Sequence, residues 1–143
     1  AGRLFQPGPL EGISNIANYY KDGGPSLKRM RQLLESLVSD KSRITDELVQ
    51  ERFEASNDPE LIALAKHGAP GTEDLYFDLL KVKAKTLVVW GQDDRAGALD
   101  VGLFMLRRLP DARMHIFPRC GHWAHVEHRD EFNHVVLNFF ENS

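Results

Sequence analysis

The chain has 143 residues, of which 42% are apolar and 27% are charged, and this composition is typical of one folded globular domain rather than of a disordered segment. The formal net charge of −3 is not the basic excess that phosphate binding needs, which argues against a nucleic-acid partner. The longest apolar run covers about five residues, which is too short to span a bilayer and predicts no membrane partner.

Residues 1–9 contain two prolines and two glycines, so they are predicted to be irregular, and they lack the apolar core of a signal peptide. A single cysteine excludes an internal disulfide and is typical of a reducing compartment. The sequence therefore predicts a soluble, cytoplasmic protein.

Four helices are predicted in the first half of the sequence, the first two because apolar residues recur at intervals of three and four, and the other two from signals at their ends. They cover residues 10–20, 27–38, 46–55 and 59–66. Ser26 and Thr45 are placed to cap the second and third helices, and Pro59 suits the first turn of the fourth. A turn at 22–25 separates the first two helices, and a linker at 68–71 follows the fourth.

Strands and helices alternate in the second half. The predicted elements are a short helix over 75–81, strands over 85–90 and 112–117, and helices over 99–109 and 127–141. The β-branched and apolar run at 85–90 is typical of a strand buried on both faces of a parallel sheet. The last helix is expected to bury one apolar side, made of Phe132, Val135, Val136, Phe139 and Phe140. The chain thus divides into a helical part (1–74) and an α/β part (75–143).

Two strands make a small sheet, since sheets of about four to six strands are usual. Strands connected through helices belong in parallel sheets that are covered on both faces, so the strand at 85–90 is predicted to lack partners. The sequence is therefore interpreted as part of a larger sheet whose other strands are on a different polypeptide or have been lost.

Polar side chains follow both strands at their C-terminal ends, where open α/β sheets place their ligands. The first loop carries Asp93 and Asp94, and the second carries Cys120, Gly121 and His122. An acid and a histidine are the rear half of a nucleophile–base–acid relay, in which the acid orients the imidazole and the imidazole takes the proton of the nucleophile. The chain order, acid and then histidine, is that of α/β-hydrolases.

Several segments resemble one family within that fold. VVWGQDDR and ARMHIFPRCGHWAHVEHRDEFNHVVLNFF resemble the C-terminus of the meta-cleavage-product hydrolases, which break a carbon–carbon bond in ring-opened aromatic compounds. LFQPGPLEGI and SDKSRITDELVQERFEA resemble the helical lid of the same family. The resemblance implies an α/β-hydrolase fold, with residues 1–74 as the lid and 75–143 as the C-terminal portion of the core.

The resemblance also implies roles for single residues. Asp94 matches the acid of the catalytic triad, and His122, 28 positions later, matches its histidine. Arg52 matches a lid arginine that meets the carboxylate of the substrate, and an arginine fork can bind both carboxylate oxygens. Trp123 matches a pocket tryptophan beside the histidine, and Leu37 matches a lid position at the apolar end of the pocket.

The sequence departs from the family pattern in two places. Ala96-Gly97-Ala98 stands where the family often has a bulky aliphatic residue and a proline, so a smaller, looser loop and a wider pocket are expected at Gly97. The chain has no G-x-S-x-G nucleophile motif: Gly12-Ile-Ser14-Asn-Ile16 lacks the second glycine and falls in a helical pattern. The nucleophilic serine is therefore expected on a missing N-terminal fragment.

The implied activity is hydrolysis of a 2-hydroxy-6-oxohexa-2,4-dienoate to a 2-hydroxypentadienoate and a carboxylic acid. No cofactor and no metal are expected, and the assembled enzyme is expected to be a homo-oligomer. Two alternatives stay open. One is another α/β-hydrolase activity, such as that of an esterase or a dehalogenase. The other is a non-catalytic remnant that binds a partner or a small acid.

Structural roles also stay open for the candidate residues. Asp94 can cap its own turn, and Arg52 can pair with acidic residues on its helix. Trp123 and Leu37 can belong to the core. Two further patterns carry less weight. Cys120 could be a nucleophile beside His122. The H-x-x-H-x-x-H spacing from His122 to His128 could indicate a metal site, but no cysteine or acid pattern completes it.

Overall fold

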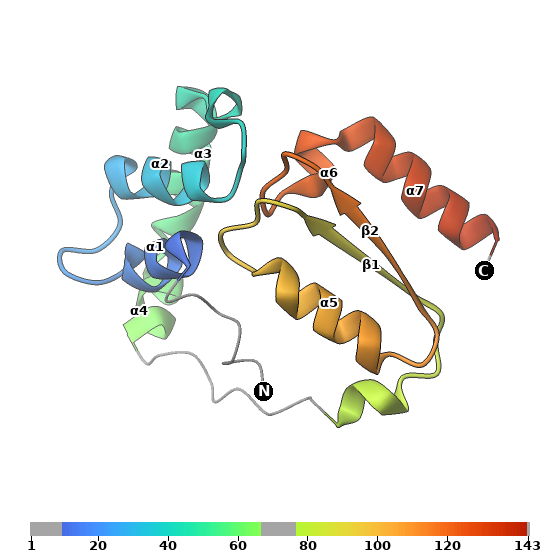
Figure 1. Ribbon diagram of the computed structural model, residues 1–143. Helices are drawn as coiled ribbons and strands as arrows, with labels where there is room; N and C mark the ends of the chain where they lie inside the picture. Colours follow the sequence, from blue (N-terminus) through green and yellow to red (C-terminus); the bar gives the residue numbers. More distant parts are fainter. Residues whose placement is uncertain (1–9, 67–76, 143) are drawn as a thin grey trace.

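The computed structural model describes residues 10–66 and 77–142, which form a helical part and an α/β part lying side by side (Figure 1). The helices of the first part are α1 (Glu11–Tyr19), α2 (Leu27–Ser36), α3 (Asp46–Ser56) and α4 (Pro59–Lys66). The second part contains β1 (Thr86–Gly91), α5 (Leu99–Arg108), β2 (Ala112–Phe117), α6 (Ala124–Glu127) and α7 (Arg129–Glu141). The predicted irregular start, the linker and the boundary at residue 74 lie outside the described residues.

The predicted helix caps are confirmed. The Ser26 hydroxyl accepts a hydrogen bond from the backbone N–H of Arg29, and the Thr45 hydroxyl accepts one from Leu48. The core of the helical part consists of Tyr19, Met30, Leu34, Val38, Ile44 and Val49. α1 buries Gly12 and Tyr19, whereas its apolar residues Ile13 and Ile16 are exposed.

The predicted second helix extends to residue 38, but α2 ends at Ser36. The backbone carbonyl of Leu37 accepts a hydrogen bond from the N–H of His122, and that of Val38 accepts one from the Arg95 side chain. In a longer helix these carbonyl groups would point along the helix axis. Here they accept hydrogen bonds from distant residues instead, so the helix does not continue.

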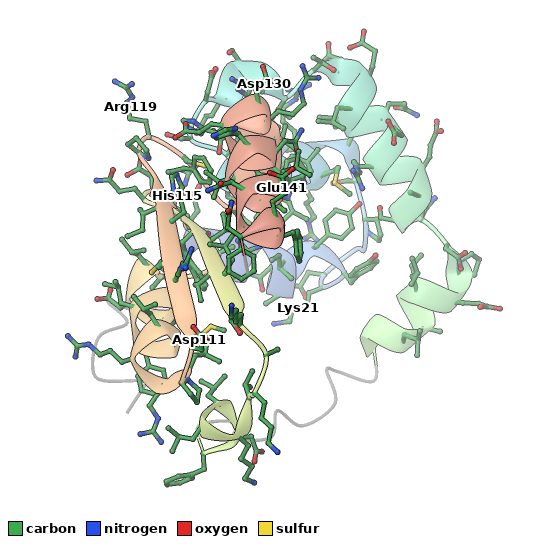
Figure 2. All side chains as sticks on the ribbon, turned by 90° about the vertical axis from the view of Figure 1, so that its right-hand side faces the viewer. Lys21, Asp111, His115, Arg119, Asp130 and Glu141 are labelled. Carbon is green, nitrogen blue, oxygen red and sulfur yellow. The ribbon has the colours of Figure 1, made fainter. Side chains whose placement is uncertain are left out.

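β1 and β2 form a parallel pair in register from Thr86 opposite Ala112 to Gly91 opposite Phe117, and within the described residues the sheet has these two strands only. α5 covers one face of the pair and α7 lies against the other (Figures 1 and 2). Among the apolar side chains of β1, Val88 is buried, whereas those of Leu87, Val89 and Trp90 are half-buried. The prediction of a strand buried on both faces is thus met only in part, because one edge of β1 has no neighbour among the described strands.

The predicted helix over 127–141 is interrupted. α6 ends at Glu127 and α7 begins at Arg129, with His128 between them in a non-helical conformation (φ −123°, ψ 41°). α7 runs back along the sheet from Asp130, near the loop that carries Arg119, to Glu141 (Figure 2).

The prediction that α7 buries one apolar side is met in part: Phe132, Val135, Val136 and Phe139 are half-buried, whereas Phe140 is exposed. No residue of α7 is fully buried, and Phe140 is 72% exposed. Phe132, near the start of the helix, packs against the cluster of Phe117, Cys120 and Ala124. Two strands give a helix little surface to cover, so the later turns of α7 keep much of their apolar area in solvent.

The short helix predicted over 75–81 is a 3-10 helix over Asp78–Lys81 in the described residues.

Candidate active site

The loops after β1 and β2 are bonded to each other. The N–H of Gln92 donates to the carbonyl of Phe117 (2.9 Å), and the N–H of Asp93 donates to that of Cys120 (2.8 Å). They meet because the C-terminal ends of parallel neighbours lie at the same edge of a sheet. Gly91 makes the close approach possible, since a Cβ there would lie 2.5 Å from the Cys120 carbonyl oxygen and closer still to that of Gly121.

Asp94 uses its two carboxylate oxygens for different purposes. Oδ1 accepts the backbone N–H groups of Ala96 (2.7 Å) and Gly97 (2.9 Å), so it caps the turn. Oδ2 lies 2.8 Å from Nδ1 of His122. The turn-capping role and the relay geometry therefore occur together, and the turn holds the carboxylate in the orientation that meets the imidazole.

The Asp94–His122 pair has a buried end and an open end. The Asp94 side chain is 5% exposed and the His122 side chain is 46% exposed. The backbone N–H of His122 donates to the Leu37 carbonyl (2.7 Å), so the histidine is attached to the segment that follows α2. With Nδ1 facing the acid, Nε2 points away from it. A histidine held in this way can take a proton from a group that approaches Nε2.

The structure also brings Arg52 and Trp123 together. The guanidinium carbon of Arg52, on α3, lies 5.9 Å from the centroid of the Trp123 ring, within the range of a cation–π contact. Trp123 follows His122 directly and packs against the core of the helical part. The exposed cation on α3 therefore lies close to the chain that carries the histidine.

Leu37 and Gly97 support this arrangement through their backbones. The Leu37 side chain is buried, and its carbonyl holds His122 as described above. The predicted loose loop at Gly97 is hydrogen-bonded on both sides: its N–H donates to Asp94, and its carbonyl accepts the indole N–H of Trp90 (2.9 Å). The expectation of a loose loop is therefore corrected, because small residues let the chain pack closely here.

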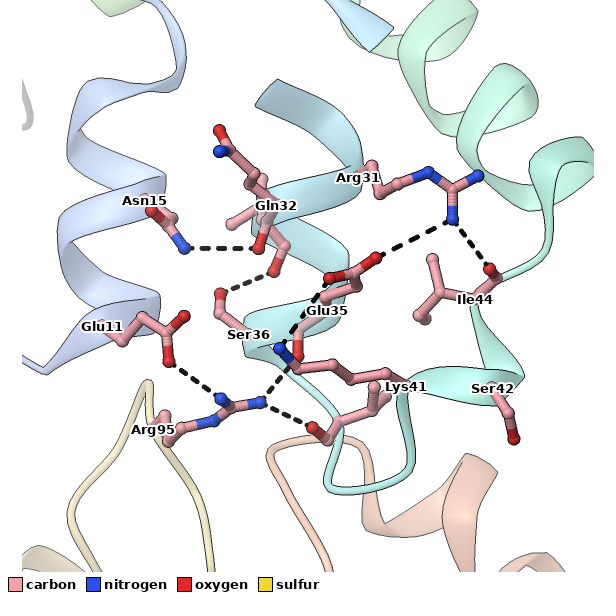
Figure 3. A network of polar contacts seen from close by, with 12 residues as sticks. Glu11, Asn15, Arg31, Gln32, Glu35, Ser36, Lys41, Ser42, Ile44 and Arg95 are labelled. Atoms are coloured by element: carbon pink, nitrogen blue, oxygen red, sulfur yellow. Dashed lines mark hydrogen bonds and ion pairs between the residues drawn. The ribbon is translucent and has the colours of Figure 1, made fainter. Parts of the chain in front are cut away.

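Sequence reasoning gave Arg95 no role, yet it connects the Asp94 loop to the helical part (Figure 3). Its guanidinium donates to the carboxylate of Glu11 (2.8 Å) and to the carbonyls of Glu35 (2.6 Å) and Val38 (2.8 Å). Its own carbonyl accepts the N–H of Gly12 (2.9 Å). The position next to Asp94 was the only sequence signal, since the partners lie 57 to 84 residues away.

The remaining sequence candidates have structural placements of their own. Ser14 lies inside α1, not in a strand-to-helix turn. His122 precedes α6, His125 lies in it and His128 follows it. Within residues 10–66 and 77–142, no group of three or more metal-ligating side chains is placed to hold an ion, and no helix is long and apolar enough to cross a membrane.

Cys120 is expected to react slowly with thiol reagents. Its side chain is fully buried, and burial, with a further contribution from the Glu127 carboxylate, raises the pKa of the thiol to about 12. Since the thiolate is the reactive form, the native protein at pH 8 should be labelled by iodoacetamide roughly a thousandfold more slowly than the urea-unfolded chain. Mass spectrometry of timed samples measures both rates. Comparable rates would restore Cys120 as a candidate nucleophile.

Comparison with known proteins gives close relatives. The chain is 44% identical to a 2-hydroxy-6-oxo-6-phenylhexa-2,4-dienoate hydrolase of Burkholderia cepacia and 42% identical to a 2-hydroxy-6-oxononadienedioate/2-hydroxy-6-oxononatrienedioate hydrolase of Comamonas testosteroni. Each alignment covers 97% of this chain and 50% of the relative. The chain thus spans about half the length of the curated relatives it matches, and the matching half is C-terminal. No family model matches the chain.

Solved structures agree with the sequence relatives. A meta-cleavage product hydrolase (CumD) from Pseudomonas fluorescens superposes with a TM-score of 0.82 at 30% identity, over 94% of this chain and 51% of that one. The prediction of an α/β-hydrolase fold, represented here by its C-terminal part, is confirmed.

Proposed function

We propose that this chain, a homologue of the C-terminal half of the meta-cleavage product hydrolases, supplies the acid, the base and the lid of an enzyme that hydrolyses a carbon–carbon bond in 2-hydroxy-6-oxohexa-2,4-dienoates. The observation that carries the proposal is the 2.8 Å contact between Asp94 Oδ2 and His122 Nδ1. The nucleophilic serine and the oxyanion hole belong to the other half of the enzyme.

The proposed chemistry follows from that contact. Asp94 holds the imidazole with Nδ1–H toward its own carboxylate, which leaves Nε2 free to accept a proton. His122 then moves protons twice: between the enol and keto forms of the substrate, and from the nucleophile that attacks the ketone. The buried carboxylate stabilises the imidazolium that each transfer creates.

Arg52 is the proposed partner of the substrate carboxylate. Glu54, one of its acidic neighbours, is hydrogen-bonded to Gln50 (2.6 Å), while Arg52 lies over Trp123. An arginine that is stacked on an aromatic ring keeps its N–H groups free to bind a planar carboxylate. The tryptophan ring offers the hydrocarbon part of the substrate an apolar surface beside His122.

The outer edge of β1 is the proposed site for the serine-bearing half. The half-buried apolar side chains there, Leu87, Val89 and Trp90, gain cover if another strand pairs with β1.

We further propose that the complete enzyme is a cytoplasmic homo-oligomer. Native mass spectrometry of the purified enzyme measures its oligomeric state, and a monomer would contradict this part of the proposal.

Purification of the protein from the cells that make it tests the proposed function. Intact-mass spectrometry should find a polypeptide with a G-x-S-x-G motif, either continuous with this sequence or co-purifying with it. The sample should hydrolyse 2-hydroxy-6-oxo-6-phenylhexa-2,4-dienoate, seen as loss of the conjugated dienolate absorbance. A folded 16.2 kDa chain without a serine-bearing companion and without turnover would overturn the proposal and favour a binding role.

Replacing Arg52 with alanine separates the dienoate activity from that of an ordinary esterase. We expect kcat/KM for the dienoate to fall about a hundredfold, because a charge-assisted arginine–carboxylate contact is lost. Hydrolysis of a neutral ester should change less than about threefold, since a neutral ester has no carboxylate for the arginine to bind. Arg107→Ala, at an exposed position on α5, is the matched control. Equal losses on both substrates would favour the esterase alternative.

A further inference from the structure

Glu127 is a buried carboxylate with no role in the proposed chemistry. It ends α6 and is 8% exposed, whereas Glu131, one turn further along the chain, lies mostly in solvent. A buried carboxylate is costly unless hydrogen-bond donors surround it. The partners of Glu127 therefore show what its burial accomplishes.

Three backbone N–H groups, from two segments that are far apart from each other along the chain, donate hydrogen bonds to this one side chain. Oε2 accepts those of Ser39 (2.7 Å) and Asp40 (3.0 Å), in the segment after α2. Oε1 accepts that of Gly121 (2.6 Å), in the loop after β2. Each oxygen thus holds a different segment, and the carboxylate joins a lid segment to the loop of the histidine.

The N–H that Glu127 binds in the loop after β2 belongs to the residue just before the histidine. Gly121 immediately precedes His122, and the N–H of His122 donates to the Leu37 carbonyl (2.7 Å). The two segments also pack closely, since a Cβ on Gly121 would lie 2.6 Å from that same carbonyl oxygen. Glu127 and Leu37 therefore hold two successive N–H groups of the chain, those of Gly121 and His122.

We propose that Glu127 is a positioning residue, which holds the His122 backbone against the segment after α2 and thereby sets the ring in reach of Asp94. The idea rests on the proposed function, because the ring position matters catalytically only if His122 is the base. It acts through backbone geometry and does not touch the substrate. A deviation of about one ångström in such a group is enough to cost a large factor in rate.

Glu127→Gln is the matched variant, because it keeps the size of the side chain and replaces one accepting oxygen with a donating NH₂. The amide oxygen can still accept hydrogen bonds from the N–H groups of one segment. The NH₂ faces the N–H of the other segment, and two donors cannot form a hydrogen bond. We expect the amide to keep the Ser39 and Asp40 bonds and to release Gly121. Glu131→Gln, at the exposed site on α7, is the control.

Hydrogen exchange and NMR on the full chain test the proposal without any need for turnover. In the unmodified protein, the amides of Ser39, Asp40 and Gly121 should all be protected from exchange. In Glu127→Gln, the amides of Gly121 and His122 should exchange about ten- to a hundredfold faster, and the His122 Nδ1 proton signal should broaden. The assembled enzyme should lose kcat about tenfold or more with KM within twofold, and Glu131→Gln should change none of these quantities.

Three results would overturn the proposal. They are unprotected Gly121 and Ser39 amides in the unmodified chain, unchanged exchange at Gly121 and His122 in Glu127→Gln, and an equal increase in exchange at every amide. The last would show a general loss of stability rather than a local release. If the unmodified enzyme shows no dienoate turnover, the proposed function fails, while the exchange data still decide whether Glu127 positions His122.

Discussion

Asp94→Asn is expected to lower kcat of the assembled enzyme about 10³- to 10⁴-fold, and His122→Ala at least as much. Asparagine keeps the shape of the side chain and an oxygen that can cap the turn at Ala96 and Gly97. Its amide group, however, donates where the carboxylate accepted, so it favours the imidazole with Nε2 protonated. That tautomer cannot take a proton from the nucleophile.

Steady-state kinetics with the dienoate, at equal concentrations of folded enzyme, measures the effect. The double variant should lose little more than either single variant, since residues that act as a unit have strongly non-additive effects. His134→Ala, at an exposed position on α7, should leave kcat unchanged. A loss of less than about tenfold in both single variants would show that the pair at 2.8 Å caps a turn and does not transfer protons.

Gly91→Ala is expected to destabilise the fold by about 3 kcal/mol or more, a large effect for a single added methyl group. The new Cβ would lie 2.5 Å from the Cys120 carbonyl oxygen and closer to that of Gly121. Both are backbone atoms, so relief requires the loops after β1 and β2 to separate. That movement breaks the hydrogen bonds from Gln92 and Asp93 that now join the loops.

Urea unfolding of the purified chain measures this difference in the free energy of unfolding. Gly23→Ala is the control, because Gly23 has a positive φ of 96° but a Cβ added there would meet nothing within 4 Å. It should cost only about 1 kcal/mol, from backbone strain alone. Equal losses in the two variants would mean that the contact between the loops contributes little to stability.

Much of the local structure was predictable from the sequence. The caps at Ser26 and Thr45 and both strands appear where residue pattern places them, because these features depend on neighbours within a few positions. The meeting of Asp94 and His122 was also predictable, since both follow parallel strands at the same sheet edge. Local periodicity and strand order were sufficient for these predictions.

Other features depend on atoms far away along the chain. α2 ends early because Leu37 and Val38 give their carbonyl groups to distant donors. The last helix keeps apolar side chains such as Phe140 in solvent because two strands cannot cover it. Hydrophobic periodicity shows which face of a helix is apolar, but it does not show how much surface is present to cover that face.

The sequence alone was enough to predict the helical first part, the strand–helix alternation and the candidate pair of Asp94 and His122, because each leaves a pattern of spacing or order among nearby residues. The contacts of Arg95 and Glu127, in contrast, became visible only in the folded chain. Most of their partners are backbone groups 57 or more residues away, such as the Val38 carbonyl for Arg95 and the Ser39 N–H for Glu127. Every residue type except proline carries the same backbone donor and acceptor, so a bond to a distant peptide leaves no mark in the sequence of either segment.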